Sequence, residues 1–275
     1  MAILEKKIDV FKKILQCSQL ELKEHVKNVL VSTGYKPVTG DGFLYAEGKI
    51  PILLVAHLDT VHKEKPTDIF YDSEQDVMWS PQGIGGDDRC GVYAILRMLY
   101  NHHPYVLFTE DEEKGCLGAE KAVSILKRPE VKFIIEIDRR GSDDCVFYNC
   151  GNKEFQTYIE SFGFETANGT YSDICVLSDE WDIASVNLSS GYYNEHSTEE
   201  YIRLNELETT YERIIDILKD EKNAKEYKYE RESRFAITNN TTNTLPRVPY
   251  HQGNAFNTNG YTDDNGNFWF WDECE

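Results

Sequence analysis

The sequence predicts an α/β protein with three layers, in which a mixed, mostly parallel sheet carries helices on both faces. Short, continuously apolar segments such as 52–56 and 133–137 are typical of strands buried at the centre of a parallel sheet. Between these segments lie others in which apolar residues recur at helical spacing. Strands that alternate with helices along the chain are typical of this class of fold.

Helices are predicted where apolar residues recur every three or four positions. They fall at residues 1–16, 18–31, 92–100, 118–126 and 171–177, and a long helix follows His196. Two helices are preceded by a capping-box pattern, in which a hydroxyl residue is followed three positions later by Glu. The two pairs are Ser18 with Glu21 and Ser197 with Glu200.

Strands are predicted from short runs that are apolar or alternate in polarity. They fall at residues 42–49, 52–56, 106–109, 133–137 and 183–188, with a hairpin at 68–80 and two or three aromatic-rich strands after Asp138. In such a sheet, ligands gather outside the carboxyl ends of the strands. Polar residues that directly follow a predicted strand are therefore the first candidates for a functional site.

The composition changes near residue 220, where charged helix gives way to a stretch rich in Asn and Thr. We expect residues 1–220 to form one domain and residues 221–275 a C-terminal extension. The extension reads as a linker followed by an aromatic-rich end, which we expect to pack on the domain because exposed aromatic clusters are uncommon on monomers.

The charge and the cysteines limit the possible partners and location. A formal net charge of -19 argues against a surface for nucleic acid or anionic membranes, because phosphate contacts need clustered Lys and Arg. No apolar run approaches the roughly 20 residues that a membrane span requires. The 7 cysteines show no paired spacing, and an odd count without a signal sequence predicts a reducing, cytoplasmic location.

One predicted strand ends abruptly in acids. The apolar run from Val106 to Thr109 is followed by four consecutive carboxylates, residues 110–113. These groups repel one another, and Lys114 is the only adjacent cation. A solvated acidic turn is one explanation, and a bound divalent cation with further ligands from elsewhere is another.

Further candidate residues stand at the ends of other predicted elements. His57 and Asp59 lie two positions apart, so an extended segment directs both to one side, as suits a ligand and its supporting carboxylate. A histidine at a strand end followed by a capping Asp would give the same pattern. Asp87 follows two glycines at a predicted helix start, where a carboxylate is favourable in any case. Asp138 could cap the next element, and His196 could be an ordinary loop histidine. Taken together at one sheet edge, these residues indicate a metal site.

The order of these segments resembles the co-catalytic (di-zinc) exopeptidases, a superfamily that includes peptidase T, carboxypeptidase G and bacterial aminopeptidases. The resemblance extends over roughly residues 50–200 and rests on residues 57–61, 85–91, 109–115, 137–138 and His196. Any one of these segments alone would be a weak signal, but the five in order are specific.

Carried over residue by residue, the resemblance implies a site for two Zn²⁺ ions, with Co²⁺ or Mn²⁺ as possible substitutes. Asp87 would bridge the ions, His57 and Asp138 would complete one of them, and Glu113 and His196 would complete the other. Glu112 would be the general base, and Asp59 would support His57. The family also implies a cis peptide bond between Asp87 and Asp88.

The resemblance implies an enzyme, a dinuclear zinc peptidase or amidohydrolase. It would cleave a peptide bond through a metal-bridging hydroxide with Glu112 as base, as an exopeptidase acting on short peptides or N-termini. An amidohydrolase that removes the acyl group from an N-acyl amino acid is the alternative. A binding or accessory protein that keeps the fold without catalysis is a third possibility, and the sequence leaves the oligomeric state open.

The chain departs from peptidase T and carboxypeptidase G in one respect. Those proteins carry a lid domain inserted before the last histidine, whereas Asp138 and His196 are only 58 residues apart here. That interval is too short for a separate domain and a return strand. We therefore expect a catalytic domain without the lid.

Overall fold

A computed structural model describes residues 2–148, 152–220, 222–231, 260–262 and 268–270. The chain divides into two compact units, Met1–Ser233 and Arg234–Glu275. In the second unit, the described residues form two antiparallel strands, β13 (Gly260–Thr262) and β14 (Phe268–Phe270). The side chains of the aromatic end, whose packing the sequence analysis predicted, lie outside the described part of the chain.

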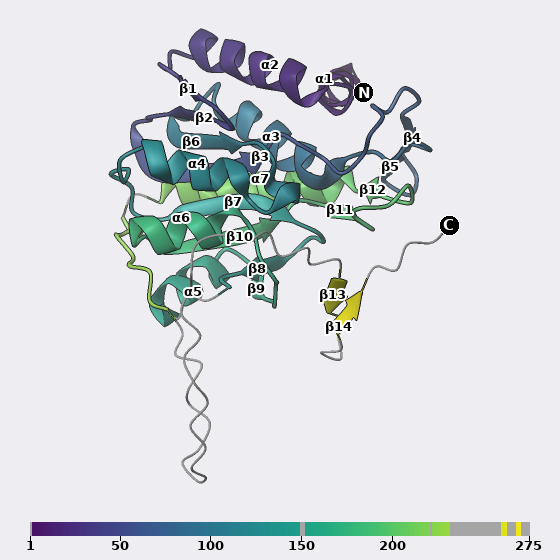
Figure 1. The fold of residues 1–275 in the computed structure, drawn as a ribbon. Coiled ribbons are helices and arrows are strands. Elements are labelled where there is room, and N and C mark those ends of the chain that lie inside the picture. The colour runs from purple at the N-terminus through teal and green to yellow at the C-terminus, as the bar shows by residue number, and fades with distance from the viewer. Residues whose placement is uncertain (1, 149–151, 221, 232–259, 263–267, 271–275) are drawn as a thin grey trace, which may run out of the picture. The chain divides into compact units, whose positions relative to one another are not determined.

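The first unit is built on an eight-stranded sheet with the order β1-β2-β6-β3-β7-β10-β8-β9 (Figure 1). Its strands are β1 (Val38–Gly40), β2 (Phe43–Ala46), β3 (Ile50–His57), β6 (Pro104–Thr109), β7 (Ile134–Arg139), β8 (Asp144–Val146), β9 (Glu165–Thr166) and β10 (Ser185–Ser189). The four central strands, β6, β3, β7 and β10, are parallel, and β2 and β8 pair with them in the antiparallel sense. The sheet is mixed with a parallel centre, as predicted.

Helices cover both faces of this sheet. They are α1 (Ala2–Leu15), α2 (Gln19–Ser32), α3 (Gly86–Met98), α4 (Leu117–Ile125), α5 (Lys153–Glu160), α6 (Asp173–Trp181) and α7 (Leu204–Lys219). Buried residues of α1, α2, α3, α5 and α7 belong to one hydrophobic cluster, and those of α4 and α6 to the other. Figure 1 shows α4 and α6 on one side of the sheet and α7 on the other. The predicted three-layer architecture is confirmed.

Strand β3 shows why its sequence is apolar at every position. Leu54 and Ala56 belong to the cluster on one face, whereas Leu53 and Val55 belong to the cluster on the other face. All four side chains are fully buried. A strand covered on both faces has no solvent side, so the usual alternation with polar residues disappears.

A second, four-stranded sheet has the order β11-β12-β5-β4. Its strands are β4 (Phe70–Asp72), β5 (Val77–Trp79), β11 (Tyr192–Tyr193) and β12 (Tyr201–Ile202). Strands β4 and β5 are antiparallel and form the hairpin predicted at residues 68–80. The pairing of β5 with β12 joins this hairpin to the segment that carries His196.

One element differs from the prediction. Helix α5 occupies part of the region in which aromatic-rich strands were expected. Its aromatic content favours a strand, but Phe155 and Ile159, four positions apart, are both fully buried and define one helical face. The Asn152 side chain accepts a hydrogen bond from the backbone N–H of Phe155 at 3.0 Å and starts the helix.

The two predicted capping boxes have opposite outcomes. Ser18 and Glu21 form a complete capping box at the start of α2. Ser197 and Glu200 do not, because α7 begins at Leu204 and the side chain of its N-cap residue, Arg203, makes no capping hydrogen bond. Glu200 is instead buried in the candidate functional site.

Between Asp138 and His196 the described residues form β8, α5, β9, α6, β10 and β11, which belong to the sheets and their covering helices. No separate lid domain is inserted among the described residues of this interval. The boundary expected at residue 220 stays a prediction, and the buried residues Ala224 and Tyr227 continue the core of the first unit beyond it. Among the described residues, no helix combines the length and apolar character needed to cross a membrane.

The capping box provides a test of the N-terminal helices. Ser18→Ala removes the oxygen that accepts the backbone N–H of Glu21 at 3.3 Å, and we expect it to lower the free energy of unfolding by about 1 kcal/mol. Urea denaturation measures the change. Ser32→Ala, at the other end of α2, is the matched control and should stay within about 0.5 kcal/mol of the parent. Equal losses in both variants would contradict a specific role for the cap.

Candidate metal centre

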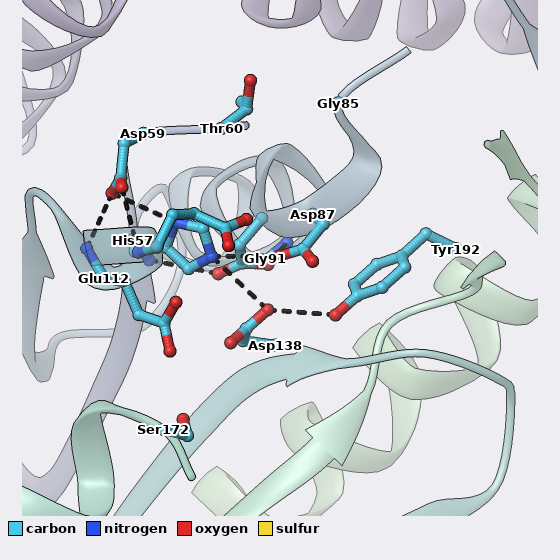
Figure 2. Close-up of polar contacts among 12 residues, drawn as sticks. His57, Asp59, Thr60, Gly85, Asp87, Gly91, Glu112, Asp138, Ser172 and Tyr192 are labelled. Atoms are coloured by element: carbon cyan, nitrogen blue, oxygen red, sulfur yellow. Dashed lines mark hydrogen bonds and ion pairs between the residues drawn. The ribbon is translucent and has the colours of Figure 1, made fainter. Parts of the chain in front are cut away.

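The residues predicted to form a site meet at the edge where the parallel strands end. Figure 2 shows His57, Asp59, Asp87, Glu112 and Asp138 close together there. His57 is the last residue of β3, and Asp138 lies one position before the end of the neighbouring strand β7. Asp87 lies in the first turn of α3. The short 3-10 helix η1 (Glu112–Lys114) follows β6, and His196 lies between β11 and β12.

Asp87 is the shared member of two clusters. Its Oδ1 atom lies 3.0 Å from His57 Nε2, and its Oδ2 atom lies 3.2 Å from His196 Nε2. The two oxygens of one carboxylate thus approach two different histidines. This is the arrangement expected of a carboxylate that bridges two cations, although its role as a ligand stays a prediction.

Asp138 completes the cluster on the His57 side. Its Oδ1 atom lies 3.6 Å from His57 Nε2 and accepts a hydrogen bond from the Tyr192 hydroxyl at 3.1 Å. The backbone around Asp138 is held by Asn187, whose side chain accepts from Asp138 N and donates to Asp138 O, each at 2.9 Å. Tyr192 and Asn187 therefore fix both the carboxylate and the main chain of this residue.

Glu113 completes the cluster on the His196 side. Its Oε2 atom lies 3.0 Å from His196 Nε2. Its Oε1 atom is buried and finds no hydrogen-bond partner among the described residues. A buried carboxylate oxygen without a partner is unfavourable unless a cation or a proton satisfies it.

Asp59 links the two halves of the site. Its Oδ1 atom lies 3.3 Å from His57 Nδ1 and accepts the backbone N–H of Glu112 at 3.2 Å. Its Oδ2 atom accepts the backbone N–H of Glu113, also at 3.2 Å. One carboxylate thus orients the imidazole and holds the turn that carries both glutamates, which extends the supporting role inferred from the sequence.

Glu112 faces differently from its neighbour. It makes no ion pair with either histidine among the described contacts, and its Oε1 atom accepts only the Cys116 thiol, at 3.7 Å. Burial raises the pKa of Glu112 to about 8. A carboxyl group with a pKa near neutrality can both take up and release a proton.

The local field strongly favours positive charge. Burial alone lowers the pKa of His57, but Asp138 and the other carboxylates around it outweigh this effect and raise that pKa well above its ordinary value. Hydrogen bonds to Asp87 and Glu113 raise the pKa of His196 to about 11. The physical cause in both cases is the excess of carboxylates around the imidazoles.

Unusual backbone geometry gathers at the same place. The peptide bond between Asp87 and Asp88 is cis, as the resemblance implied. Asp111 and Cys116, on either side of η1, have φ values of 60° and 59°, and His196 has a φ of 63°. Non-glycine residues in the left-handed region are uncommon and concentrate at functional sites.

The donor set fits a divalent metal. Ligand atoms of His57, Asp87 and Glu113 lie within 4.8 Å of one another, close enough together to hold a metal ion. Imidazole nitrogen with carboxylate oxygen suits zinc and also manganese or cobalt. The unpartnered oxygen of Glu113 and the excess of carboxylates are both relieved by a cation, so the residues present fit the metal that the resemblance implies.

Glu200 is the residue that sequence reasoning misplaced. Its two oxygens accept the backbone N–H groups of Gly85 at 2.9 Å and Asp87 at 3.0 Å. Its Oε2 atom also lies 2.9 Å from His62 Nε2. Glu200 therefore holds the loop that presents Asp87. Its spacing from Ser197 gave no signal of this role, because the contacts join positions more than 100 residues apart.

An open cavity of about 240 Å³ adjoins the two clusters. Its walls include Asp87, Glu112, Glu113, Asp138 and His196 together with Arg139, Arg140, Tyr148, Tyr171 and Glu195. Arg140 pairs with Glu195 at 3.0 Å. The cavity wall is therefore acidic next to the two clusters. Elsewhere it is formed by the Arg140–Glu195 ion pair and by aromatic rings.

The comparisons with known proteins define the class of fold. No protein-family model matches the chain, and no curated protein matches it in sequence. Solved structures do match, and they show that the chain has the α/β fold of the zinc exopeptidases over about 78% of its length.

Three structures illustrate the similarity. Aminopeptidase PepT from Bacillus cereus ATCC 10987 has a TM-score of 0.63 and 15% identity, covering 78% of this chain and 97% of its own. A tripeptidase from Staphylococcus aureus subsp. aureus Mu50 has a TM-score of 0.65 and 14% identity, with coverages of 78% and 97%. An aminopeptidase from the archaeon Desulfurococcus kamchatkensis has a TM-score of 0.59 and 14% identity, with coverages of 78% and 95%. At these identities the likeness shows the fold, and the chemistry is argued from the site.

Asp59 offers a test of how the centre is held together. Asp59→Asn leaves one oxygen where three donors now converge, and we expect zinc affinity to fall about 10-fold to 100-fold. Titration against a competing chelator measures the affinity. The exposed Asp68→Asn, in the loop that follows, is the matched control. Unchanged affinity in Asp59→Asn would show that this carboxylate does not support the centre.

Proposed function

We propose that the chain is a metal-dependent hydrolase that cleaves a peptide bond as an exopeptidase on short peptides or N-termini. The observation that carries the proposal is the position of Asp87, whose two oxygens approach His57 and His196 at 3.0 and 3.2 Å. The fold similarity to aminopeptidases and a tripeptidase supports the reaction class.

The same geometry supports an assignment of ligands to two zinc ions. His57, Asp138 and one oxygen of Asp87 would hold the first ion. His196, Glu113 and the other oxygen of Asp87 would hold the second. When bound, such ions supply Lewis acidity and lower the pKa of a water molecule to near neutrality.

Glu112 would move the proton. Its carboxyl group lines the cavity beside the two clusters and has no ion-pair partner among the described residues. It would accept a proton from the attacking water and return it to the nitrogen of the leaving amine. Glu113, the next residue, is occupied by His196 and is not available for this role.

Other side chains would position the reacting groups. Asp59 orients His57 and holds the turn of Glu112 through backbone contacts. Tyr192 fixes the carboxylate of Asp138. Each contact limits the motion of a group that must be aligned with the substrate, and such alignment supplies much of the rate acceleration of enzymes.

The substrate would lie in the open cavity, without a lid domain to close it. The Arg140–Glu195 pair offers both a cation and an anion within the cavity wall, and Tyr148 and Tyr171 offer aromatic faces. A short peptide carries both terminal charges and side chains that suit such a wall. A cytoplasmic location is a further proposal, which rests on the cysteine pattern of the sequence.

The two adjacent glutamates give the sharpest test. Glu112→Gln should lower kcat by about 100-fold to 10,000-fold with a metal content near that of the parent, because an amide cannot accept the proton. Glu113→Gln should instead lower the metal content, since it replaces a ligand. Peptide hydrolysis and elemental analysis measure the two effects. Equal metal loss in both variants would contradict the assignment, and less than one ion per parent chain after incubation with zinc would favour a non-catalytic protein.

The alternative is an amidohydrolase that removes the acyl group from N-acyl amino acids, because the same metals and base would serve both reactions. Kinetics on di- and tripeptides with free amino groups, compared with the N-acetyl forms of the same amino acids, separate the two. We expect kcat/KM to favour the free peptides. Turnover of the blocked compounds alone would replace the exopeptidase with the amidohydrolase while leaving the metal centre in place.

A further inference from the structure

A second cavity, of about 200 Å³, shares none of its lining residues with the cavity of the metal centre. We call it the Arg89 cavity. It forms where the connection between α1 and α2 meets two loop segments, and its lining includes Thr60, Lys63, Glu64, Lys65, Gly85 and Arg89. The proposed hydrolase chemistry gives this cavity no role.

Arg89 is the unusual member of this wall. Arg89 is only 4% exposed, and its Nη2 atom donates a hydrogen bond to the backbone oxygen of Cys17 at 3.3 Å. The Nε and Nη1 atoms are buried and have no hydrogen-bond partner among the described residues. No carboxylate of the described chain lies within ion-pair distance of it. A buried guanidinium in this state is unfavourable unless an anion or other acceptors satisfy it.

The charge of Arg89 is not removed by its surroundings. Arginine is not deprotonated in proteins, so the guanidinium keeps its positive charge in the buried site. Arg presents its N–H groups as a planar fork, which matches the oxygens of a carboxylate or phosphate group.

Two further cations stand among the lining residues. Lys63 and Lys65 are exposed, and Lys65 pairs with Glu21 at 2.8 Å. Glu64 is the only carboxylate that lines the cavity. In a chain with a formal net charge of -19, a cavity with three basic side chains and one acidic side chain departs from the overall balance. Exposed lysines attract anions toward the cavity, and the buried arginine provides the specific contact.

We propose that the Arg89 cavity binds a small oxyanion, a phosphate or carboxylate group, with Arg89 as its buried partner and Lys63 and Lys65 as exposed ones. The volume suffices, since a water molecule occupies about 30 Å³ of liquid. The bound anion supplies a negative charge beside the Arg89 guanidinium, which has no carboxylate within ion-pair distance among the described residues. This inference stands independently of the proposed hydrolase function.

The position of the cavity gives the anion a connection to the metal centre. Thr60 directly follows Asp59, and Gly85 donates its N–H to Glu200, which also holds Asp87. An anion in the cavity contacts both of these segments. It therefore stabilises the loops that present the metal-binding carboxylates.

Isothermal titration calorimetry on the full chain tests the proposal, with inorganic phosphate and succinate as separate probes at low ionic strength. We expect saturable binding of one anion per chain, weakened by added NaCl because Lys63 and Lys65 are exposed to solvent. The probe that binds more tightly identifies phosphate or carboxylate as the preferred group. Absence of saturable binding for both probes would overturn the proposal.

Variants locate the bound anion. Arg89→Met should weaken binding about tenfold or more, as the loss of a hydrogen bond to a charged group implies. Because a buried substitution can impair folding, the exposed pair Lys63→Ala and Lys65→Ala provides a second arm in which we expect a smaller loss. Lys127→Ala, another exposed lysine, is the matched control and should bind as the parent does.

Glu113→Gln distinguishes the Arg89 cavity from the metal centre, since phosphate can also bind to metal ions. Binding that survives Glu113→Gln and is weakened by the cavity variants supports the proposal. Binding that depends on Glu113, or that is indifferent to Arg89 and both lysines, would overturn it. Circular dichroism of each variant confirms that the compared proteins are folded.

Discussion

Carboxylates crowd the carboxyl edge of the parallel strands, and their mutual repulsion is the constraint on which the rest of the site depends. Some are neutralised by the protein itself. Glu110 pairs with Lys23 of α2, and Asp111 pairs with Lys114 at 2.8 Å. Asp59 accepts two backbone N–H groups. These contacts do not neutralise the carboxylates around Asp87, which face two histidines. Cations bound there would offset the remaining negative charge.

Much of this site could be predicted from the sequence because a parallel sheet forces the ends of its strands together. His57, Asp138 and the glutamates of η1 each follow an apolar run, so their meeting requires only the fold class. Asp87 was indicated by the glycines before it. The fold class could be predicted for a related reason, since strands buried on both faces are apolar at every position.

The remainder of the site was beyond sequence reasoning because it depends on contacts between distant loops. Ser197 and Glu200 have the same spacing as Ser18 and Glu21, yet only Ser18 and Glu21 form a capping box. Glu200 is drawn into the site by backbone N–H groups that no local pattern reveals. Tyr192 reaches Asp138 across 54 positions, and its sequence context is simply a short aromatic strand. A local pattern predicts structure only where tertiary contacts agree with it.

The two adjacent glutamates show how the fold can give identical residues different chemistry. Asp59 accepts the backbone N–H groups of both Glu112 and Glu113, so the turn is fixed by the main chain and neither carboxylate is needed to hold it. Left-handed residues on either side of η1 keep the turn short. The Glu113 side chain then reaches His196, whereas the Glu112 side chain accepts a hydrogen bond from the thiol of Cys116. Because the backbone fixes the turn, the proposed division of roles, with Glu113 as a metal ligand and Glu112 as the proton carrier, needs no further contact from either carboxylate to hold the turn in place.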